Sequence, residues 1–270
     1  MRIDVNCFLG SYPFRKVPGT SPAALLSAMD RVGIDQAWVS HLPSVFWSDP
    51  AAGNEWLLKT CVTHNRFRPV LAVHPGLAGW EGVVANALES GAPAVRCDPT
   101  FYGIDPSGRE MKSLVERCAA ERVPLVLAVR LEDGRQRHPN DRAAELPPWA
   151  VRALVRHAPV QLLITHADRG FVEEVHFGST PEESERMWWD ICWIWGPPED
   201  HLQTLLSTIG YKRFVLGTGQ PLRLPESSLA KLDLLDLSGE QRTAIESDTA
   251  ASLAVPSTRK GSRTAKKVPV

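Results

Sequence analysis

A run of five ionisable residues follows a short apolar segment in the middle of the chain. The apolar segment is Val123–Leu131, and the ionisable residues at its end are Arg130, Glu132, Asp133, Arg135 and His138. An arginine beside a carboxylate can hold it ionised as a general base, and a second arginine can bind a substrate carboxylate through two parallel hydrogen bonds. The same run is also typical of a loop held together by salt bridges, so the sequence leaves both interpretations open.

Three histidines and one aspartate end other apolar segments at comparable positions. They are His41, His74, Asp98 and His166. A zinc site needs three or four nitrogen, oxygen or sulfur ligands that converge, and these residues form one conceivable set. A histidine at the end of a strand is also often a packing residue. The sequence therefore requires no cofactor, and a divalent metal such as zinc stays an alternative.

The elements that position these residues are short apolar segments separated by helical patterns. The predicted strands cover residues 3–9, 36–41, 68–74, 93–97, 123–131, 160–166, 186–194 and 213–216. Residues 20–33 are typical of the helices between them, because Pro22 suits the first turn and Gly33 ends the helix. This alternation predicts a parallel sheet covered by helices, and eight units in about 250 residues predict a single (β/α)8 barrel.

In such a barrel the catalytic groups lie at the carboxyl ends of the strands and in the loops that follow. We therefore predict that His166 acts as an acid or base, with Asp98, Glu132 or Asp133 as the carboxylate base. The residues predicted to contact the substrate are Asn6, Arg15, Arg96, Arg130 and Arg135. Two or three arginines at one cavity predict an anionic substrate.

Three motifs resemble the amidohydrolase-related superfamily, in its amidohydrolase 2-like branch. They are the first strand with Ile3-Asp4 and Gly10, the segment Leu162–Gly170 around His166, and the segment Tyr211–Pro221. The resemblance covers residues 2–254 in order and spacing. It implies a (β/α)8 barrel and the chemistry of a metal-dependent hydrolase or decarboxylase.

The metal-ligand positions of that family are mostly changed in this sequence. The resemblance implies His-x-His on the first strand, one histidine on the fifth strand, one on the sixth and an aspartate on the eighth. Asn6 and Phe8 stand at the first pair, and Ala128–Arg130 at the fifth-strand position. Gly219 stands at the position of the aspartate, and His166 is the one residue that matches the family's ligand at its position. The resemblance therefore implies a divergent subgroup with a degenerate or absent metal site.

Two functions fit these observations. The first is an amidohydrolase-related hydrolase or carbon–carbon lyase (decarboxylase-like) that acts on a small carboxylated substrate, without a metal or with a rearranged metal site. The second is a non-catalytic barrel that binds a ligand or protein partner. An enzyme should present His166, Arg130 and a carboxylate to one cavity. A binding barrel should have that cavity filled, by Phe8 or a tryptophan.

The composition excludes some classes of partner. The 270 residues carry a formal net charge of −1, with 43% hydrophobic and 23% charged residues. We therefore expect neither nucleic acid nor an anionic membrane as a partner, and no apolar run is long enough for a membrane span. No signal-like segment opens the chain, and its five scattered cysteines fit buried thiols in a reducing compartment, so we expect a cytoplasmic protein.

The remaining segments give further expectations. Alternation along Trp188–Trp195 places Trp189, Trp193 and Trp195 on one face, for packing, a substrate wall or the interface of a homo-oligomer. On the first strand, alternation also places Asp4 and Asn6 on a common face. Residues 171–185 are typical of a flexible lid. We expect residues 1–254 to form the barrel and the basic residues 255–270 to form a disordered tail.

Overall fold

The structure is a computed structural model that describes residues 1–255. The tail predicted for residues 255–270 therefore lies outside the described residues, apart from Val255. No helix in the described part is both long enough and apolar enough to cross a membrane.

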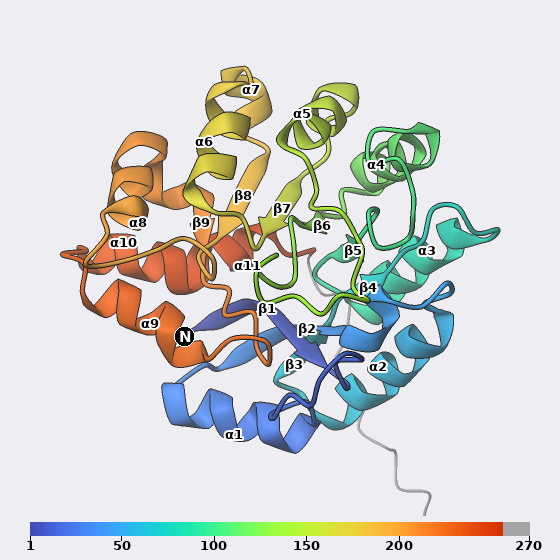
Figure 1. The fold of residues 1–270 in the computed structure, drawn as a ribbon, viewed down its shortest axis with the longest axis horizontal. Coiled ribbons are helices and arrows are strands. Elements are labelled where there is room, and N and C mark those ends of the chain that lie inside the picture. The colour runs from blue at the N-terminus through green and yellow to red at the C-terminus, as the bar shows by residue number, and fades with distance from the viewer. Residues whose placement is uncertain (256–270) are drawn as a thin grey trace, which may run out of the picture.

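The strands lie at the centre of the molecule and pair in parallel with their neighbours (Figure 1). They are β1 (Ile3–Leu9), β2 (Gln36–His41), β3 (Phe67–Pro69), β4 (Leu71–Ala72), β5 (Val95–Cys97), β6 (Leu125–Ala128), β7 (Leu162–Thr165), β8 (Met187–Asp190) and β9 (Phe214–Val215). Only Val70 separates β3 from β4, and its backbone nitrogen donates to Val39 O on β2 at 2.8 Å. These two segments therefore form one strand, and the barrel has the eight strands that the sequence predicts.

Backbone hydrogen bonds between the first and last strands close the barrel. Val5 N donates to Leu216 O at 2.9 Å, and Gly219 N donates to Asn6 O at 2.8 Å. The predicted (β/α)8 architecture is thus confirmed, with no free edge between β1 and β9.

Helices surround the strands on all sides (Figure 1). They are α1 (Pro22–Val32), α2 (Ala51–Thr63), α3 (Trp80–Ser90), α4 (Arg109–Glu121), α5 (Pro148–His157), α6 (Arg169–Phe177), α7 (Pro181–Ser184), α8 (His201–Leu205), α9 (Pro225–Asp233), α10 (Gly239–Thr243) and α11 (Thr249–Leu253). The ends of α1 follow the expected chemistry. Ser21 accepts a hydrogen bond from Ala24 N, and Gly33 ends the helix at a φ of 69°.

The prediction of a flexible lid at residues 171–185 is wrong, because helices α6 and α7 occupy this segment. The Asp168 side chain caps α6 by accepting from Phe171 N at 3.0 Å. Thr180 and Glu183 form a reciprocal capping box at the start of α7. These caps bind backbone N–H groups that have no partner within the first turn of each helix. The segment is therefore helical despite its polar composition.

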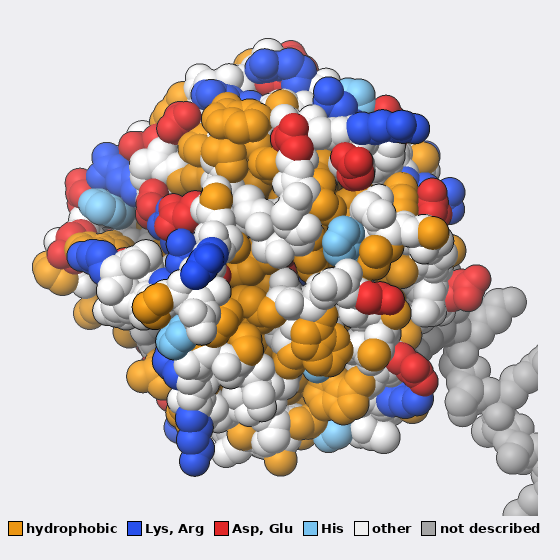
Figure 2. All heavy atoms as spheres, turned by 45° about the vertical axis from the view of Figure 1, so that its right-hand side comes forward, with side chains coloured by type: hydrophobic (Ala, Val, Ile, Leu, Met, Phe, Trp, Pro, Cys, Tyr) orange, Lys and Arg blue, Asp and Glu red, His pale blue; other side chains and the backbone are white. Residues whose placement is uncertain are grey.

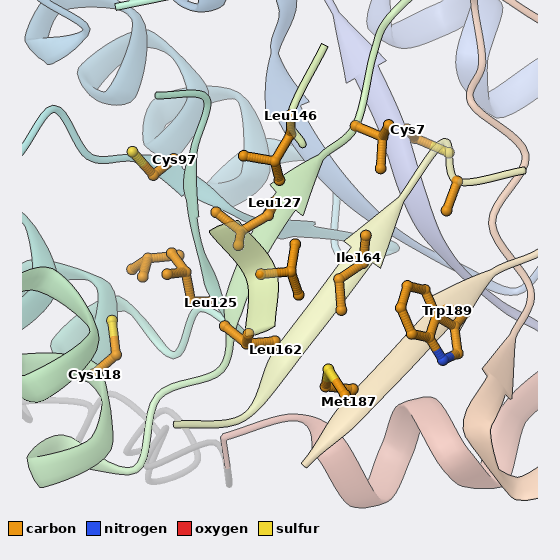
Figure 3. Packing of buried hydrophobic residues seen from close by; sticks show 14 of the residues in the cluster. Cys7, Cys97, Cys118, Leu125, Leu127, Leu146, Leu162, Ile164, Met187 and Trp189 are labelled. Carbon is orange, nitrogen blue, oxygen red and sulfur yellow. The ribbon is translucent and has the colours of Figure 1, made fainter. Parts of the chain in front are cut away.

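Two apolar layers stabilise the barrel. The outer layer lies between the strands and the helices, and Figure 3 shows part of it along β6, β7 and β8, where Leu127, Ile164 and Trp189 pack together. The inner layer combines side chains from most of the strands, among them Val5 and Leu163, with Ala250 and Leu253 of α11. Helix α11 therefore covers the amino-terminal end of the barrel, and any site must lie at the opposite end.

Candidate functional site

Four buried polar side chains meet inside the barrel at the carboxyl ends of β1, β7 and β8. Asn6 Nδ2 donates to Asp190 Oδ2 at 2.6 Å and lies 3.4 Å from His166 Nδ1. The Cys192 thiol donates to the same Asp190 oxygen at 3.2 Å, and His166 N donates to Asp190 Oδ1 at 3.0 Å. We call Asn6, His166, Asp190 and Cys192 the central cluster. Asp190 joins its members, because it accepts a hydrogen bond from each of the other three residues.

Burial changes the protonation of the cluster. It raises the pKa of the Asp190 carboxyl above its ordinary value and raises the pKa of the Cys192 thiol well above 9.0. It also lowers the pKa of the His166 imidazole well below 6.5, and the charges of Arg96, Arg223 and Arg130 lower it further. The cluster therefore carries little charge, and the nearby arginines make the electrostatic potential around it positive.

A bulge in β1 turns Asn6 toward this cluster. The pairing of β1 with β2 shifts register between Asp4 and Cys7, which breaks strict alternation of the side chains. Asp4 instead accepts hydrogen bonds from the Cys7 thiol at 2.9 Å and from the Thr218 hydroxyl at 2.6 Å. The prediction that Asp4 and Asn6 share a face is therefore wrong. Burial raises the pKa of Asp4 to about 6.

Two glycines after β9 make room for the cluster. A Cβ atom on Gly217 would lie 2.7 Å from Asp190 Oδ2, and one on Gly219 would lie 3.2 Å from His166 Nε2. Gly219 also has a φ of 73°, and His166 itself has a φ of 59°, which is uncommon for a residue with a side chain. Such backbone strain gathers at functional sites, because packing must hold it in place.

Arg96 and Asp98 form an ion pair that is almost completely buried. Arg96 Nε lies 2.7 Å from Asp98 Oδ2, and Arg96 Nη2 lies 2.9 Å from Asp98 Oδ1. The guanidinium carbon of Arg96 lies 4.6 Å from the centre of the Phe8 ring. Asp98 is thus held as the partner of Arg96 at the place where the sequence predicts a base.

Arg130 lies beside the cluster and is also paired. Its guanidinium donates to Asp168 Oδ2 at 2.7 Å and to Glu145 Oε2 at 2.9 Å. It lies over the ring of Trp193, at 5.2 Å from the ring centre. Arg130, Asp168 and Trp193 line a groove of about 320 Å³, together with Arg135 and Asp133.

The other ionisable residues predicted around this strand form ion pairs in the loops. Glu132 accepts from the Tyr12 hydroxyl at 3.0 Å and pairs with Arg15. Asp133 pairs with the exposed Arg135 at 2.7 Å, which lowers the pKa of Asp133 below its ordinary value. This part of the run is therefore organised as the salt-bridged loop that the sequence left open.

The substitute metal set predicted from the sequence is not brought together. His41 Nδ1 lies 2.8 Å from Ser44 Oγ and packs against tryptophans, whereas His74 stacks on Tyr102 at 4.5 Å. Asp98 is paired with Arg96. Within residues 1–255, one group of metal-ligand side chains has its donor atoms within 4.8 Å of one another, and it consists of His166, Asp190 and Cys192.

Aromatic side chains close the barrel above the cluster. Phe8 is fully buried and packs with Tyr12 and Leu131. Phe14 and Phe46 pack edge to face against Tyr12, with ring centres 5.4 and 5.7 Å from that of Tyr12. His166 is likewise fully buried. The space that the sequence predicts as an open cavity at His166 is therefore covered in this conformation.

The tryptophan run does not form one face. Trp189 is buried in the outer core, and Trp193 is nearly buried beside Arg130 and Arg223. Trp195 is 56% exposed and stacks on His201. Alternation fails because β8 ends at Asp190 and the chain then turns.

Asp190, Cys192 and Arg223 are the site residues to which the sequence analysis assigns no role. All five cysteines are buried and none forms a disulfide bond, as predicted, so nothing in the composition distinguishes Cys192. Its place two residues after Asp190, at the end of a strand, is the one available signal. Arg223 follows the Gly-Thr-Gly turn, and its guanidinium carbon lies 3.9 Å from the centre of the Trp193 ring.

Arg223 borders a second pocket of about 280 Å³, which we call the Arg223 pocket. Cys192, Trp195, Glu199 and Lys231 also line it. Lys231 Nζ donates to the backbone oxygens of Ile191 and Cys192, and burial lowers its pKa to about 8. Within the described chain, no carboxylate lies within ion-pair distance of Arg223, in contrast to Arg15, Arg96, Arg130 and Arg135.

The fold is similar to those of solved structures. A dihydroxybenzoic acid decarboxylase from Polaromonas, with bound manganese and the inhibitor 2-nitroresorcinol, matches over 93% of this chain and 96% of that one, with a TM-score of 0.71 and 14% identity. An amidohydrolase II matches over 94% and 99%, with a TM-score of 0.70 and 17% identity. A probable 2-pyrone-4,6-dicarboxylic acid hydrolase from Acinetobacter baumannii, with bound citric acid, matches over 93% and 98%, with a TM-score of 0.63 and 10% identity.

The protein has the barrel fold of amidohydrolase-related enzymes. The similarity to this fold that the sequence motifs imply is thus confirmed. No protein-family model and no curated protein matches the sequence itself. Identities of 10–17% describe the fold alone, so the chemistry has to be argued from the residues present.

The residues at the metal positions of that family do not fit a metal here. Phe8 and Gly219 carry no ligand atom, and Arg130 at the fifth-strand position is a cation bound to carboxylates. Asn6 is the hydrogen-bond donor of Asp190. A metal with the family's own ligand arrangement is therefore incompatible with this chain.

Proposed function

We propose that the protein is an amidohydrolase-related hydrolase or carbon–carbon lyase that acts on a small carboxylated molecule at the carboxyl end of its barrel. The observation that carries the proposal is Arg223. Its guanidinium stacks on Trp193, has no carboxylate partner within residues 1–255, and borders a pocket next to the central cluster. Arg223 is half-buried, and an arginine without an acidic partner is suited to bind a carboxylate through two parallel hydrogen bonds.

The lining of the Arg223 pocket favours an anion. Lys231 adds a second cation to the wall, and Glu199 is the acidic residue in it. Trp195 lines both this pocket and the groove beside Arg130, so an aromatic or acyl group of the ligand can lie against its ring. The bound citric acid and nitroresorcinol in similar structures show small acidic ligands on the same fold.

The reacting group would lie at the central cluster. A Cβ atom placed on Gly219 would contact His166, Cys192 and the Arg223 side chain, so these three residues surround one point. His166 would supply the imidazole, and Asp190 would fix the position of the His166 backbone. Arg96 and Arg130 would contribute positive charge that stabilises an anionic transition state.

Asp98, Glu132 and Asp133 have other roles in this proposal. Each carboxylate is already the partner of an arginine, and Asp98 has no access to solvent. Arg15, Arg96, Arg130 and Arg135 likewise hold protein carboxylates. They would shape the walls of the site, whereas Arg223 would bind the substrate carboxylate.

A non-catalytic binding barrel is the second candidate, and the closed mouth favours it. Phe8 and the aromatic side chains above it cover His166, as expected for a barrel without turnover. Hydrophobic side chains also gather in the middle of the face shown in Figure 2, with charged side chains mostly around them. Such a surface is suited to a protein partner or a second copy of the chain.

The test is a screen of small aromatic and aliphatic carboxylic acids against the purified full chain and Arg223→Met. We expect at least one acid to raise the melting temperature of the wild type, and Arg223→Met to lose this shift. Arg213→Met is the matched control, because Arg213 also lies over a tryptophan, at 5.3 Å from the centre of Trp188, but borders neither pocket.

Product analysis of the same acids separates the two candidates. Release of carbon dioxide or hydrolysis that depends on His166 supports the enzyme, whereas stabilisation without turnover supports the binding barrel. No stabilisation by any acid, or equal stabilisation of Arg223→Met and wild type, contradicts the proposed carboxylate site.

A further inference from the structure

We propose that His166, Asp190 and Cys192 bind a zinc ion. One donor atom from each residue lies within 4.8 Å of the others, and all three side chains are completely buried. The residues come from the ends of β7 and β8 and from the turn that follows β8. This ligand set shares only His166 with the set considered from the sequence. Its other two members come from the end of β8 and from the turn after β8.

The donor types favour zinc over other divalent cations. Imidazole nitrogen, carboxylate oxygen and thiolate sulfur are the ligands that zinc sites in proteins use. Magnesium, calcium and manganese prefer oxygen ligands, so a cysteine among three ligands disfavours them. Binding would release the Cys192 thiol proton to solvent, because the thiolate is the form that ligates.

An independent observation comes from Asn6. Its carboxamide points into the group, with Nδ2 at 2.6 Å from Asp190 Oδ2 and 3.8 Å from Cys192 Sγ. The oxygen of this carboxamide is buried and has no hydrogen-bond partner. A buried polar atom without a partner is costly and unusual. Rotation of the carboxamide would turn Oδ1 toward the ligand atoms, where it would gain a cation as its partner.

Gly219 keeps one side of the group free of a side chain. A Cβ atom on Gly219 would lie 3.2 Å from His166 Nε2 and 3.5 Å from Cys192 Sγ. A larger residue there would fill the space in front of these two ligand atoms. The turn after β9 thus leaves this side open, and the ends of β7 and β8 contribute the ligands.

The charges balance in the zinc-bound state. A thiolate and a carboxylate neutralise the two positive charges of the ion, so the completed site is neutral. A neutral centre is compatible with Arg96, Arg130 and Arg223 nearby, all of which act on the His166 side chain. An ion held by neutral ligands alone would face these three cations uncompensated.

The zinc site adds a cofactor to the proposed function and does not depend on Arg223. Bound zinc would supply a Lewis acid close to the pocket in which we place the substrate carboxylate. His166 would then act as a ligand, and the acid–base role expected from the sequence would pass to another group.

The experiment uses the full chain, stripped with a chelator and then loaded with Zn²⁺ or Co²⁺. We expect about one zinc per chain and a rise in melting temperature on loading. The cobalt protein should show the near-ultraviolet charge-transfer band of a cobalt–thiolate bond. Cys192→Ser should lose this band, and Asp190→Asn should bind zinc more weakly by a factor of about 10–100.

Cys97→Ser is the matched control, because Cys97 is also buried and outside any disulfide, but it ends β5 and its thiol donates to Met111 Sδ at 3.6 Å. It should retain both the zinc and the cobalt–thiolate band. Cys192→Ala provides a second variant, and circular dichroism of both variants establishes that they fold. Absence of the band in the wild type, or its persistence in folded Cys192→Ser or Cys192→Ala, overturns the proposal. Carboxylate binding by the metal-free protein, measured separately, reports on Arg223 alone.

Discussion

The side-chain nitrogen of Asn6 lies 2.6 Å from Asp190 Oδ2, and this hydrogen bond joins β1 and β8 across the interior of the barrel. Asp190 in turn accepts hydrogen bonds from His166 N and the Cys192 thiol. The residue that replaces a family metal ligand on the first strand therefore organises a different cluster on β7 and β8.

Loss of this hydrogen bond should destabilise the protein. We expect Asn6→Ala to lower the free energy of unfolding by about 1–3 kcal/mol, because Asp190 then loses a buried donor. Urea denaturation measures the effect. Asn140→Ala is the control, since Asn140 lies exposed in a loop. Equal stability of the two variants would show that Asn6 does not support the cluster.

The buried Arg96–Asp98 pair should be sensitive to removal of one partner. Asp98→Asn leaves the Arg96 guanidinium without its counter-ion, and we expect a loss of about 3–5 kcal/mol in the free energy of unfolding. Asp133→Asn breaks an ion pair of the same type in an exposed loop and should change stability little. Similar effects of both substitutions would contradict the importance of burial.

His41 should make stability depend on pH. Burial lowers the pKa of His41 from 6.5 to about 4, so the unfolded chain takes up a proton at this residue before the folded protein does. Its contribution to stability is complete above pH 6.5 and is lost as the pH falls toward about 4. The free energy of unfolding should therefore fall more steeply between these pH values for the wild type than for His41→Gln. Parallel slopes in urea titrations across this range would refute the prediction.

Gly219 should tolerate a methyl group less well than another glycine of similar conformation. Gly219 and Gly79 have φ values of 73° and 79°, so alanine strains the backbone at both, by about 1–2 kcal/mol. Only at Gly219 would the added Cβ meet His166 Nε2 and Cys192 Sγ, because nothing lies within 4 Å of the Gly79 position. Gly219→Ala should thus destabilise the protein more than Gly79→Ala in thermal unfolding. The reverse order would mean that the cluster adapts freely.

The chain pattern alone predicts much of this fold. Apolar segments too short for anything but strands alternate with helical patterns, and a closed parallel barrel is the arrangement that covers both faces of eight such strands. The same logic places His166 and Arg130 at one end of the barrel, because parallel strands end on the same side. The lid predicted for residues 171–185 is wrong because the polar composition of the segment resembles a loop, whereas the caps at Asp168 and Thr180 start helices there.

The sequence by itself determined the barrel, the end at which its polar residues gather and the loss of the family's metal ligands. Only the tertiary structure decided which of those residues touch. Arg96, Arg130 and Arg15 look like free cations in the sequence, but each has a protein carboxylate, whereas Arg223 has none within residues 1–255 and lies over Trp193. The reason is physical: these contacts join loops and strand ends far apart in the chain, and their partners depend on a backbone path that no local pattern records.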